Sequence, residues 1–373
     1  MLKVGFAFNL NIQRCEIEVG EEKQIIDKGY KPLLELFAKY NMKANWFVSG
    51  YSSEIIEKED KAFLDKILAA KDKVIKLGTY TYTHPIPQLL IRSEFDHQVR
   101  VGKEYDKAIL KEDTKGFLPP EFAYSGEMAS VLHDHDIEWI ITLASQVEKS
   151  YKKAGIKDDP YQPCILDIGD GKTLQAVAAA YELPDCPARF LKLMMKGLLP
   201  VDAVIDGIKK FHEQHPDKFL LFKRDGETVF IDFFNGGFDK TYEVLDEFLS
   251  KLSALDFVQP VWIEEVIASQ KEYHTIKLAD FLGNTKIETF TEGAAKPIWD
   301  LTLEVREEIL KAEKEKRDPS LIEKAWHHLL LSHNSDGRIG YWFSKWNPGE
   351  HEVAPSRRQF CEDNLRIALE ILK

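Results

Sequence analysis

The segment MLKVGFAFNLNI, residues 1–12, decides the fold class. Val4, Phe6 and Phe8 alternate with two small residues, which is the period-two pattern of a β-strand. The segment has one lysine, no long apolar core and no small-residue cleavage site. It is therefore predicted to be a first strand and not a signal peptide.

Strand-like and helix-like segments alternate after this first strand. The apolar positions of 30–37 recur with helical spacing, and the lysine-rich stretch 61–71 is also helix-like. Such alternation predicts an α/β fold with mostly parallel strands. The further strands expected are 43–50, 74–78, 139–143, 219–224 and 257–261.

The pattern changes after Lys271, where helical stripes replace the alternation. Residues 298–309 carry one apolar stripe, and 321–330 carry a stronger one that follows an N-cap at Asp318 and a proline at 319. A last helix is expected over 360–372. We therefore predict an α/β catalytic domain over 1–271 and a helical domain over 272–373.

The composition excludes several functional classes. Lys plus Arg (50) against Asp plus Glu (62) gives a net charge of −12, which would repel a nucleic-acid backbone. No apolar run approaches the roughly 18 residues of a membrane span. The four cysteines are far apart and form no CxxC pair, which fits a reducing cytoplasm. A homo-oligomer remains open.

Polar residues follow several of the expected strands. Ligands of parallel sheets bind at the carboxyl ends of the strands, so these residues are site candidates. Among them, Glu121 follows a Pro-Pro turn, and Asp225 directly follows the expected strand 219–224. Two carboxylates from different strand ends are the ingredients of glycoside hydrolysis.

Four segments resemble motifs of glycoside hydrolase family 57, and they occur in the family's order. They are Gly78–Leu90, which contains the His84-Pro pair, Gly116–Ser125 around Glu121, Leu221–Glu227 around Asp225, and Ala325–Asp336. The resemblance implies an incomplete, seven-stranded (β/α) barrel followed by helices. It also implies a retaining glycosidase for α-linked substrates, with Glu121 as the nucleophile and Asp225 as the general acid/base.

The first motif departs from the family pattern. The family opens with a His-x-His-Gln-Pro stretch, or in its α-galactosidase-like branch with His-Gly-Asn-Leu-Gln-Tyr-Ala-Glu. Here the segment 9–16 keeps the amides and the acid but has Asn9 at the histidine position. The implied substrate is an α-galactoside or an α-glucan.

The same resemblance suggests which side chains bind the sugar. Asn9, Asn11, Gln13 and His84 are expected to line the subsite nearest the cleaved bond, with Asp336 and Trp342 as further contacts. The retaining mechanism predicts a separation of about 5–5.5 Å between the carboxyl groups of the catalytic pair. Asp225 is expected to hold a proton near neutral pH, with Glu227 as the source of repulsion.

Other interpretations remain open. Glu121 could cap a helix, Asp225-Gly226 could be a hairpin turn leading to 229–234, and His84 could be a buried histidine. A non-hydrolytic carbohydrate-binding relative is the main functional alternative. A polysaccharide deacetylase is more distant, because Asn9 and Tyr80 stand where metal ligands are needed. No metal and no cofactor are expected.

Overall fold

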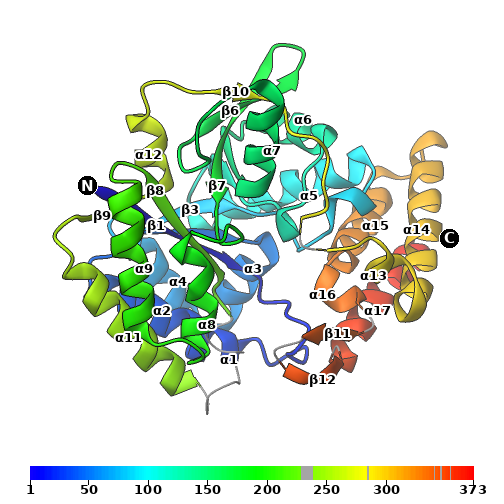
Figure 1. Ribbon diagram of the computed structural model, residues 1–373. Helices are drawn as coiled ribbons and strands as arrows, with labels where there is room; N and C mark the ends of the chain where they lie inside the picture. Colours follow the sequence, from blue (N-terminus) through cyan, green and yellow to red (C-terminus); the bar gives the residue numbers. More distant parts are fainter. Residues whose placement is uncertain (228–237, 284, 340, 345–346, 353) are drawn as a thin grey trace.

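A ten-stranded sheet forms the centre of the molecule (Figure 1). The computed structural model describes residues 1–373 except 228–237, 284, 340, 345–346 and 353; for 238–239, 341–344 and 347–352 it describes the backbone alone. Along the order β7-β5-β4-β3-β2-β1-β8, every neighbouring pair of strands is parallel. These seven strands confirm the predicted incomplete barrel, which is open between β7 and β8.

Every strand expected from the sequence is present, and two further parallel strands, Gly116–Phe117 and Lys172–Ala179, were not predicted. Helices or loops connect each strand to the next and cover the outside of the sheet (Figure 1). The parallel strands are β1 (Leu2–Leu10), β2 (Ala44–Val48), β3 (Ile75–Thr79), β4 (Gly116–Phe117), β5 (Trp139–Leu143), β7 (Lys172–Ala179) and β8 (Phe219–Asp225), with β9 (Val258–Pro260) beside β1.

The helices that accompany the sheet are mostly short. Their bounds are α1 (Lys23–Ile25), α2 (Lys31–Lys39), α3 (Gly50–Glu59), α4 (Lys61–Ala70), α5 (Arg92–Tyr105), α6 (Gly126–Asp134), α7 (Ala144–Ala154), α8 (Leu191–Met195), α9 (Val201–Gln214), α11 (Phe238–Ser253) and α12 (Ile263–Ser269).

Strand β1 shows why the alternation in the sequence predicts its packing. Phe6 and Phe8 face the helix layer, where both rings meet Phe37 of α2 edge to face at centroid distances of 4.9 and 5.3 Å. Ala7 points the other way, into an inner cluster that contains Phe47 and Leu221. Both faces of β1 are therefore buried, as is usual for a strand of a parallel sheet.

A hairpin departs from the parallel arrangement and was not predicted. β6 (Cys164–Gly169) pairs antiparallel with β7, and β10 (Thr275–Ile276) adds to its outer edge. The hairpin alternates apolar residues with polar ones such as Asp167 and Thr173. Its turn, at residues 169–172, lies within a stretch whose glycines predict a turn.

The C-terminal helices gather on one side of the sheet (yellow to red in Figure 1). They are α13 (Glu288–Thr291), α14 (Lys296–Lys314), α15 (Pro319–Ser332), α16 (Ser335–Arg338) and α17 (Pro355–Leu372), with the small hairpin of β11 (Tyr341–Ser344) and β12 (Asn347–Glu352). As predicted, Asp318 caps α15 by accepting a hydrogen bond from the Ser320 amide. The domain boundary at residue 271 stays a prediction.

Candidate active site

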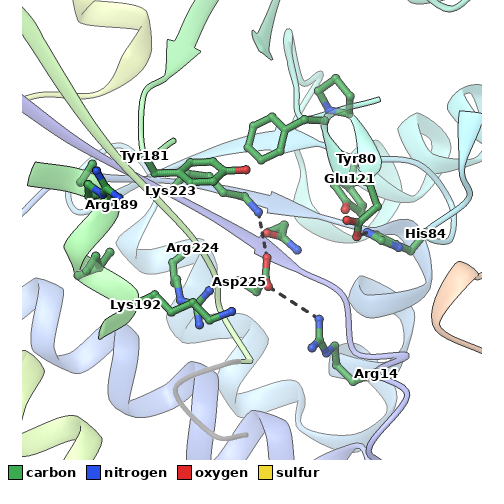
Figure 2. Close-up of a pocket in the computed structure, with 15 residues that line it drawn as sticks. Arg14, Tyr80, His84, Glu121, Tyr181, Arg189, Lys192, Lys223, Arg224 and Asp225 are labelled. Carbon is green, nitrogen blue, oxygen red and sulfur yellow. Dashed lines mark hydrogen bonds and ion pairs between the residues drawn. The ribbon is translucent and has the colours of Figure 1, made fainter. Parts of the chain in front are cut away.

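A cavity of about 310 Å³ lies where the carboxyl ends of β1, β3, β4 and β8 meet (Figure 2). Each of these strand ends contributes at least one polar side chain to the cavity wall: Asn9 from β1, His84 after β3, Glu121 after β4 and Asp225 from β8. The register of the sheet places Asn9 directly beside Asp225. The sequence thus brings four of its predicted site residues to one cavity.

Glu121 has an unusual backbone conformation. Its φ is +53°, and that of the following Phe122 is +58°, so two successive non-glycine residues are left-handed. Such strain persists only where the surroundings hold it, and it is concentrated at functional sites. Here Tyr124 pairs with Phe281 of the C-terminal segment in an antiparallel bridge next to the turn.

Gly283 packs directly against the backbone of Glu121. A Cβ atom at this glycine would lie 1.8 Å from the backbone oxygen of Glu121, so no other residue fits without movement. Gln88 adds a second link, since its Nε2 donates to the carbonyl oxygens of Tyr124 (3.1 Å) and Phe281 (2.9 Å). Two segments distant in the sequence, at Gln88 and over 281–283, therefore hold the turn that carries Glu121.

His84 is the nearest cation-forming neighbour of Glu121. Its Nε2 lies 3.9 Å from Glu121 Oε1, its Nδ1 lies 2.7 Å from Ser335 Oγ, and Tyr80 stacks on its ring. Burial lowers the pKa of His84 to about 4, and the charge of Arg14 acts in the same direction. His84 is therefore neutral at pH 7 and acts through hydrogen bonds.

Asp225 is surrounded by cations. Lys223 Nζ lies 2.9 Å from its Oδ1, and Arg14 Nη1 lies 3.8 Å from its Oδ2. Desolvation alone would raise the pKa of Asp225, but Lys223, Arg14 and Arg224 together hold it well below its ordinary value. The prediction that Asp225 holds a proton near neutral pH is therefore wrong for the free protein.

The other carboxyl groups show the opposite shift. Desolvation and the charge of Asp225 raise the pKa of Glu121, although His84 counters them. Burial raises the pKa of Glu227 to about 8, with a further contribution from Asp225. Of Asp225 and Glu227, it is thus Glu227 that is protonated near neutral pH, because the cations favour the ionised form of Asp225.

Asn11 and Gln13 lie behind the cavity and not on its wall. Asn11 joins two acids: its Nδ2 donates to Oδ2 of half-buried Asp336 (2.7 Å), and its backbone N–H donates to Oε1 of buried Glu227 (3.0 Å). Gln13 is fully buried. The expectation that these two share one wall with Asn9 and His84 needs correction, because Asn11 is hydrogen-bonded to Asp336 and Glu227 and Gln13 is buried.

Asp336 and Trp342 also differ from the expected arrangement. Asp336 is held by Asn11 and does not line the cavity, and burial raises its pKa to about 6. Trp342 lies in β11, but its side chain falls outside the described residues. The segment 229–234, suggested as the second arm of a hairpin after Asp225, is outside the described residues as well.

Sequence reasoning missed several residues of the cavity wall. Lys223 precedes Asp225 by two positions, so strand periodicity alone would have placed both on one face. Tyr80, which stands where a deacetylase needs a metal ligand, stacks on His84. Arg14 gave no periodic signal, because it follows the end of β1.

The described part of the chain gives little support for a metal site or a membrane span. No three His, Cys, Asp or Glu side chains gather there in a way that could hold an ion. None of the helices seen in that part is long and apolar enough to cross a membrane. All four cysteines are buried and reduced.

An incomplete barrel with two carboxylates at the carboxyl ends of its strands is an arrangement on which glycosidases are built. Residues 12–279 match the model of glycosyl hydrolase family 57, which covers well over half of the chain. The chain therefore belongs to this family. No curated protein matches it.

Solved structures share the fold at low sequence identity. A 4-alpha-glucanotransferase from Thermococcus litoralis has a TM-score of 0.76 and 16% identity over 100% of this chain and 60% of its own. The alpha-amylase AmyC from Thermotoga maritima has a TM-score of 0.70 and 12% identity over 99% of this chain and 92% of its own. A GH57-type branching enzyme from Pyrococcus horikoshii has a TM-score of 0.68 and 13% identity over 99% of this chain and 88% of its own. The chain thus spans less than two thirds of the glucanotransferase.

Proposed function

We propose that this chain hydrolyses an α-linked glucoside with retention of the anomeric configuration. The observation that carries the proposal is that Glu121 and Asp225, which stand at the two catalytic positions of the motifs, line one cavity from different strands. In this scheme Glu121 is the nucleophile and Asp225 is the general acid and then the general base.

In the first step, a carboxylate oxygen of Glu121 attacks the anomeric carbon while Asp225 protonates the leaving oxygen. The bond from the anomeric carbon to the leaving group breaks, and a glycosyl-enzyme ester forms. In the second step, Asp225 removes a proton from water, which attacks the anomeric carbon and releases Glu121. His84, neutral and 3.9 Å from Glu121, leaves the nucleophile ionised.

The ionised state of Asp225 suits the second step and opposes the first. The proposal therefore requires the Lys223 ammonium to move away from Asp225 when the sugar enters the cavity. Asn9 offers a partner for that sugar, since its Oδ1 is buried and has no hydrogen-bond partner among the described residues.

Family membership and the printed names of the structural neighbours favour an α-glucan over an α-galactoside. Two of the three structures above are named for alpha-glucan or alpha-amylase activity, and none of the three is named for a galactoside. The α-galactoside half of the sequence prediction has no support from them.

A non-hydrolytic carbohydrate-binding protein is the second candidate. The contact of Lys223 with Asp225 favours it, because an acid that is permanently ion-paired cannot protonate a leaving group. A screen of nitrophenyl α- and β-glucosides and galactosides, together with maltooligosaccharides, separates the two candidates. Release of nitrophenol from an α-glucoside supports hydrolysis, whereas saturable maltooligosaccharide binding with no turnover of any substrate supports the binding protein.

A further inference from the structure

The C-terminal helices contact the cavity wall at His84. Helix α16 begins at Ser335, and the backbone N–H of Ser335 donates to the carbonyl oxygen of His84 at 2.8 Å. The Oγ atom of the same serine lies 2.7 Å from Nδ1 of the His84 ring. Both residues are buried, although 251 positions separate them in the sequence. Ser335 thus holds both the backbone and the side chain of His84.

The two segments that meet here are also joined by their neighbours. Asn334, the residue before α16, donates from Nδ2 to the carbonyl oxygen of Gln13 at 2.9 Å. Thr83, the residue before His84, donates from Oγ1 to the carbonyl oxygen of Leu330 at 3.0 Å. All four residues are buried. The position of Ser335 relative to His84 is therefore set by several contacts and not by one hydrogen bond alone.

The ring of His84 has a defined orientation among its partners. Tyr80 stacks on the ring with a centroid distance of 5.1 Å, Ser335 contacts Nδ1, and Nε2 faces Oε1 of Glu121 at 3.9 Å (Figure 2). Burial lowers the pKa of His84 to about 4, so near neutral pH one ring nitrogen carries a proton and the other does not. The tautomer decides whether an N–H or a lone pair faces Glu121.

The surroundings favour the tautomer with the proton on Nε2. An ionised carboxylate has acceptor atoms only, so an unprotonated Nε2 would turn a lone pair toward the lone pairs of Glu121. Nδ1 is then an acceptor, and the Ser335 hydroxyl lies at the distance of a donor. Within the described part of the chain this hydroxyl has no other hydrogen-bond partner, so no acceptor there competes with Nδ1 for its hydrogen.

We propose that Ser335 is a positioning residue of the active site: its hydroxyl donates to Nδ1 of His84 and keeps the Nε2 proton directed at Glu121. This inference rests on the proposed function, in which Glu121 attacks as a carboxylate. An N–H that faces the carboxylate favours its ionised form without adding a positive charge to the cavity. The C-terminal helices then contribute to catalysis, although none of their described residues lines the cavity.

The tautomer can be measured without turnover. Long-range proton–nitrogen correlation spectra of the histidine-labelled protein near neutral pH show which ring nitrogen carries the proton. His84→Gln identifies the signals of His84 by their loss. We expect the proton on Nε2 in the wild type. Ser335→Ala removes the donor to Nδ1 and should lower the population of this tautomer, whereas Ser335→Thr keeps a hydroxyl and should retain it.

Turnover of an activated α-glucoside gives the second measurement. The kcat of Ser335→Ala should fall about three- to tenfold, the effect of one lost hydrogen bond, while KM changes less, because the N–H faces the nucleophile. Ser335→Thr should recover most of the kcat. Ser332→Ala is the matched control, since Ser332 is also a buried serine but donates to the carbonyl oxygen of Leu329 in its own helix. It should keep the wild-type tautomer and kcat.

A wild-type His84 with its proton on Nδ1 would overturn the inference, and this result depends on no variant. The inference also fails if Ser335→Ala keeps the wild-type tautomer or kcat, if a folded Ser335→Thr behaves like Ser335→Ala, or if Ser332→Ala shows the same losses. Thermal denaturation establishes that each variant is folded. Failure of the proposed function looks different: the wild type then cleaves no α-glucoside, whereas the tautomer of His84 is still measurable.

Discussion

The Nζ atom of Lys223 lies 2.9 Å from Oδ1 of Asp225, two positions further along the same face of β8. The pair couples a predicted general acid to a permanent cation in the free protein. It explains why Asp225 is ionised although it lies in a cavity, where desolvation alone would raise its pKa. Lys223 acts on the pKa of Asp225 together with Arg14 and Arg224.

Lys223→Met should therefore raise the pKa of Asp225. The profile of kcat/KM against pH reports the ionisation of the free enzyme, so its falling limb should move to higher pH in this variant. Activity near neutral pH should rise for substrates whose leaving group needs a proton. The measurement is kcat/KM from pH 3 to pH 9 with a nitrophenyl glucoside and a maltooligosaccharide.

Lys209→Met is the matched control, because Lys209 is exposed on α9 and its charge partner is Asp206. Its pH profile should match that of the wild type. An unchanged profile for Lys223→Met would mean that Lys223 does not set the pKa of Asp225 during catalysis.

Gly283→Ala should disturb the turn that carries Glu121. The new Cβ would lie 1.8 Å from the Glu121 backbone oxygen, and the φ of +65° adds the cost of a left-handed alanine. We expect a lower free energy of unfolding and a reduced kcat, since the turn must shift to relieve the clash. Thermal denaturation and steady-state kinetics measure the two effects.

Gly155→Ala is the control that separates the cost of a left-handed alanine from the effect of displacing the turn that carries Glu121. Gly155 has a φ of +71° after α7 but nothing within 4 Å of an added Cβ. It should lose about 1–2 kcal/mol of stability and keep its kcat. Gly283→Ala should lose at least about 1 kcal/mol more. Equal losses of stability with unchanged kcat in both variants would show that Gly283 does not support Glu121.

The buried Glu227 should make stability depend on pH. Its pKa is about 8 in the folded protein and near 4.5 in the unfolded chain, so between these values the folded state binds more protons. The free energy of unfolding should then fall as pH rises from about 5 to 8, by at most about 1.4 kcal/mol per pH unit. Buried Asp106 and Asp336, with pKa values of about 7 and about 6, add to this fall, whereas His84, with its pKa lowered to about 4, opposes it between about pH 4 and 6.5.

Glu227→Gln should remove this residue's contribution and make the slope less negative, because a glutamine does not titrate. Urea unfolding at pH 5, 6, 7 and 8 gives the slope for each protein. Glu307→Gln, at an exposed position of α14, should keep the wild-type slope. A slope that Glu227→Gln leaves unchanged would mean that another group carries the pH dependence.

Much of the fold follows from local pattern. The alternation in β1 predicts a strand because large residues meet the helix layer and small ones fill the barrel interior. The Asp318-Pro319 signal predicts the start of α15 because capping is a local interaction. The β6–β7 hairpin was missed because polar residues interrupt its apolar run and dilute the signal.

The site is less predictable, since its contacts join distant segments. The motifs bring Glu121 and Asp225 to one cavity, but no spacing reveals that Asn11 binds Asp336 across 325 positions. The protonation state of Asp225 depends on Arg14 and Lys223 together, and the arginine reaches it from another strand end. The protonation state of such a group follows only from the three-dimensional arrangement of its charged neighbours.

The catalytic roles of Glu121 and Asp225 are tested most directly by azide rescue of the two alanine variants on an activated α-glucoside. Glu121→Ala should abolish hydrolysis, and Asp225→Ala should cost roughly 10²–10⁴-fold. The account predicts that azide restores turnover of Glu121→Ala with a β-glucosyl azide product, and of Asp225→Ala with an α-glucosyl azide. Proton NMR of the products distinguishes the two anomers. The opposite assignment of anomers would exchange the two roles, and wild-type turnover by both variants would contradict the account altogether.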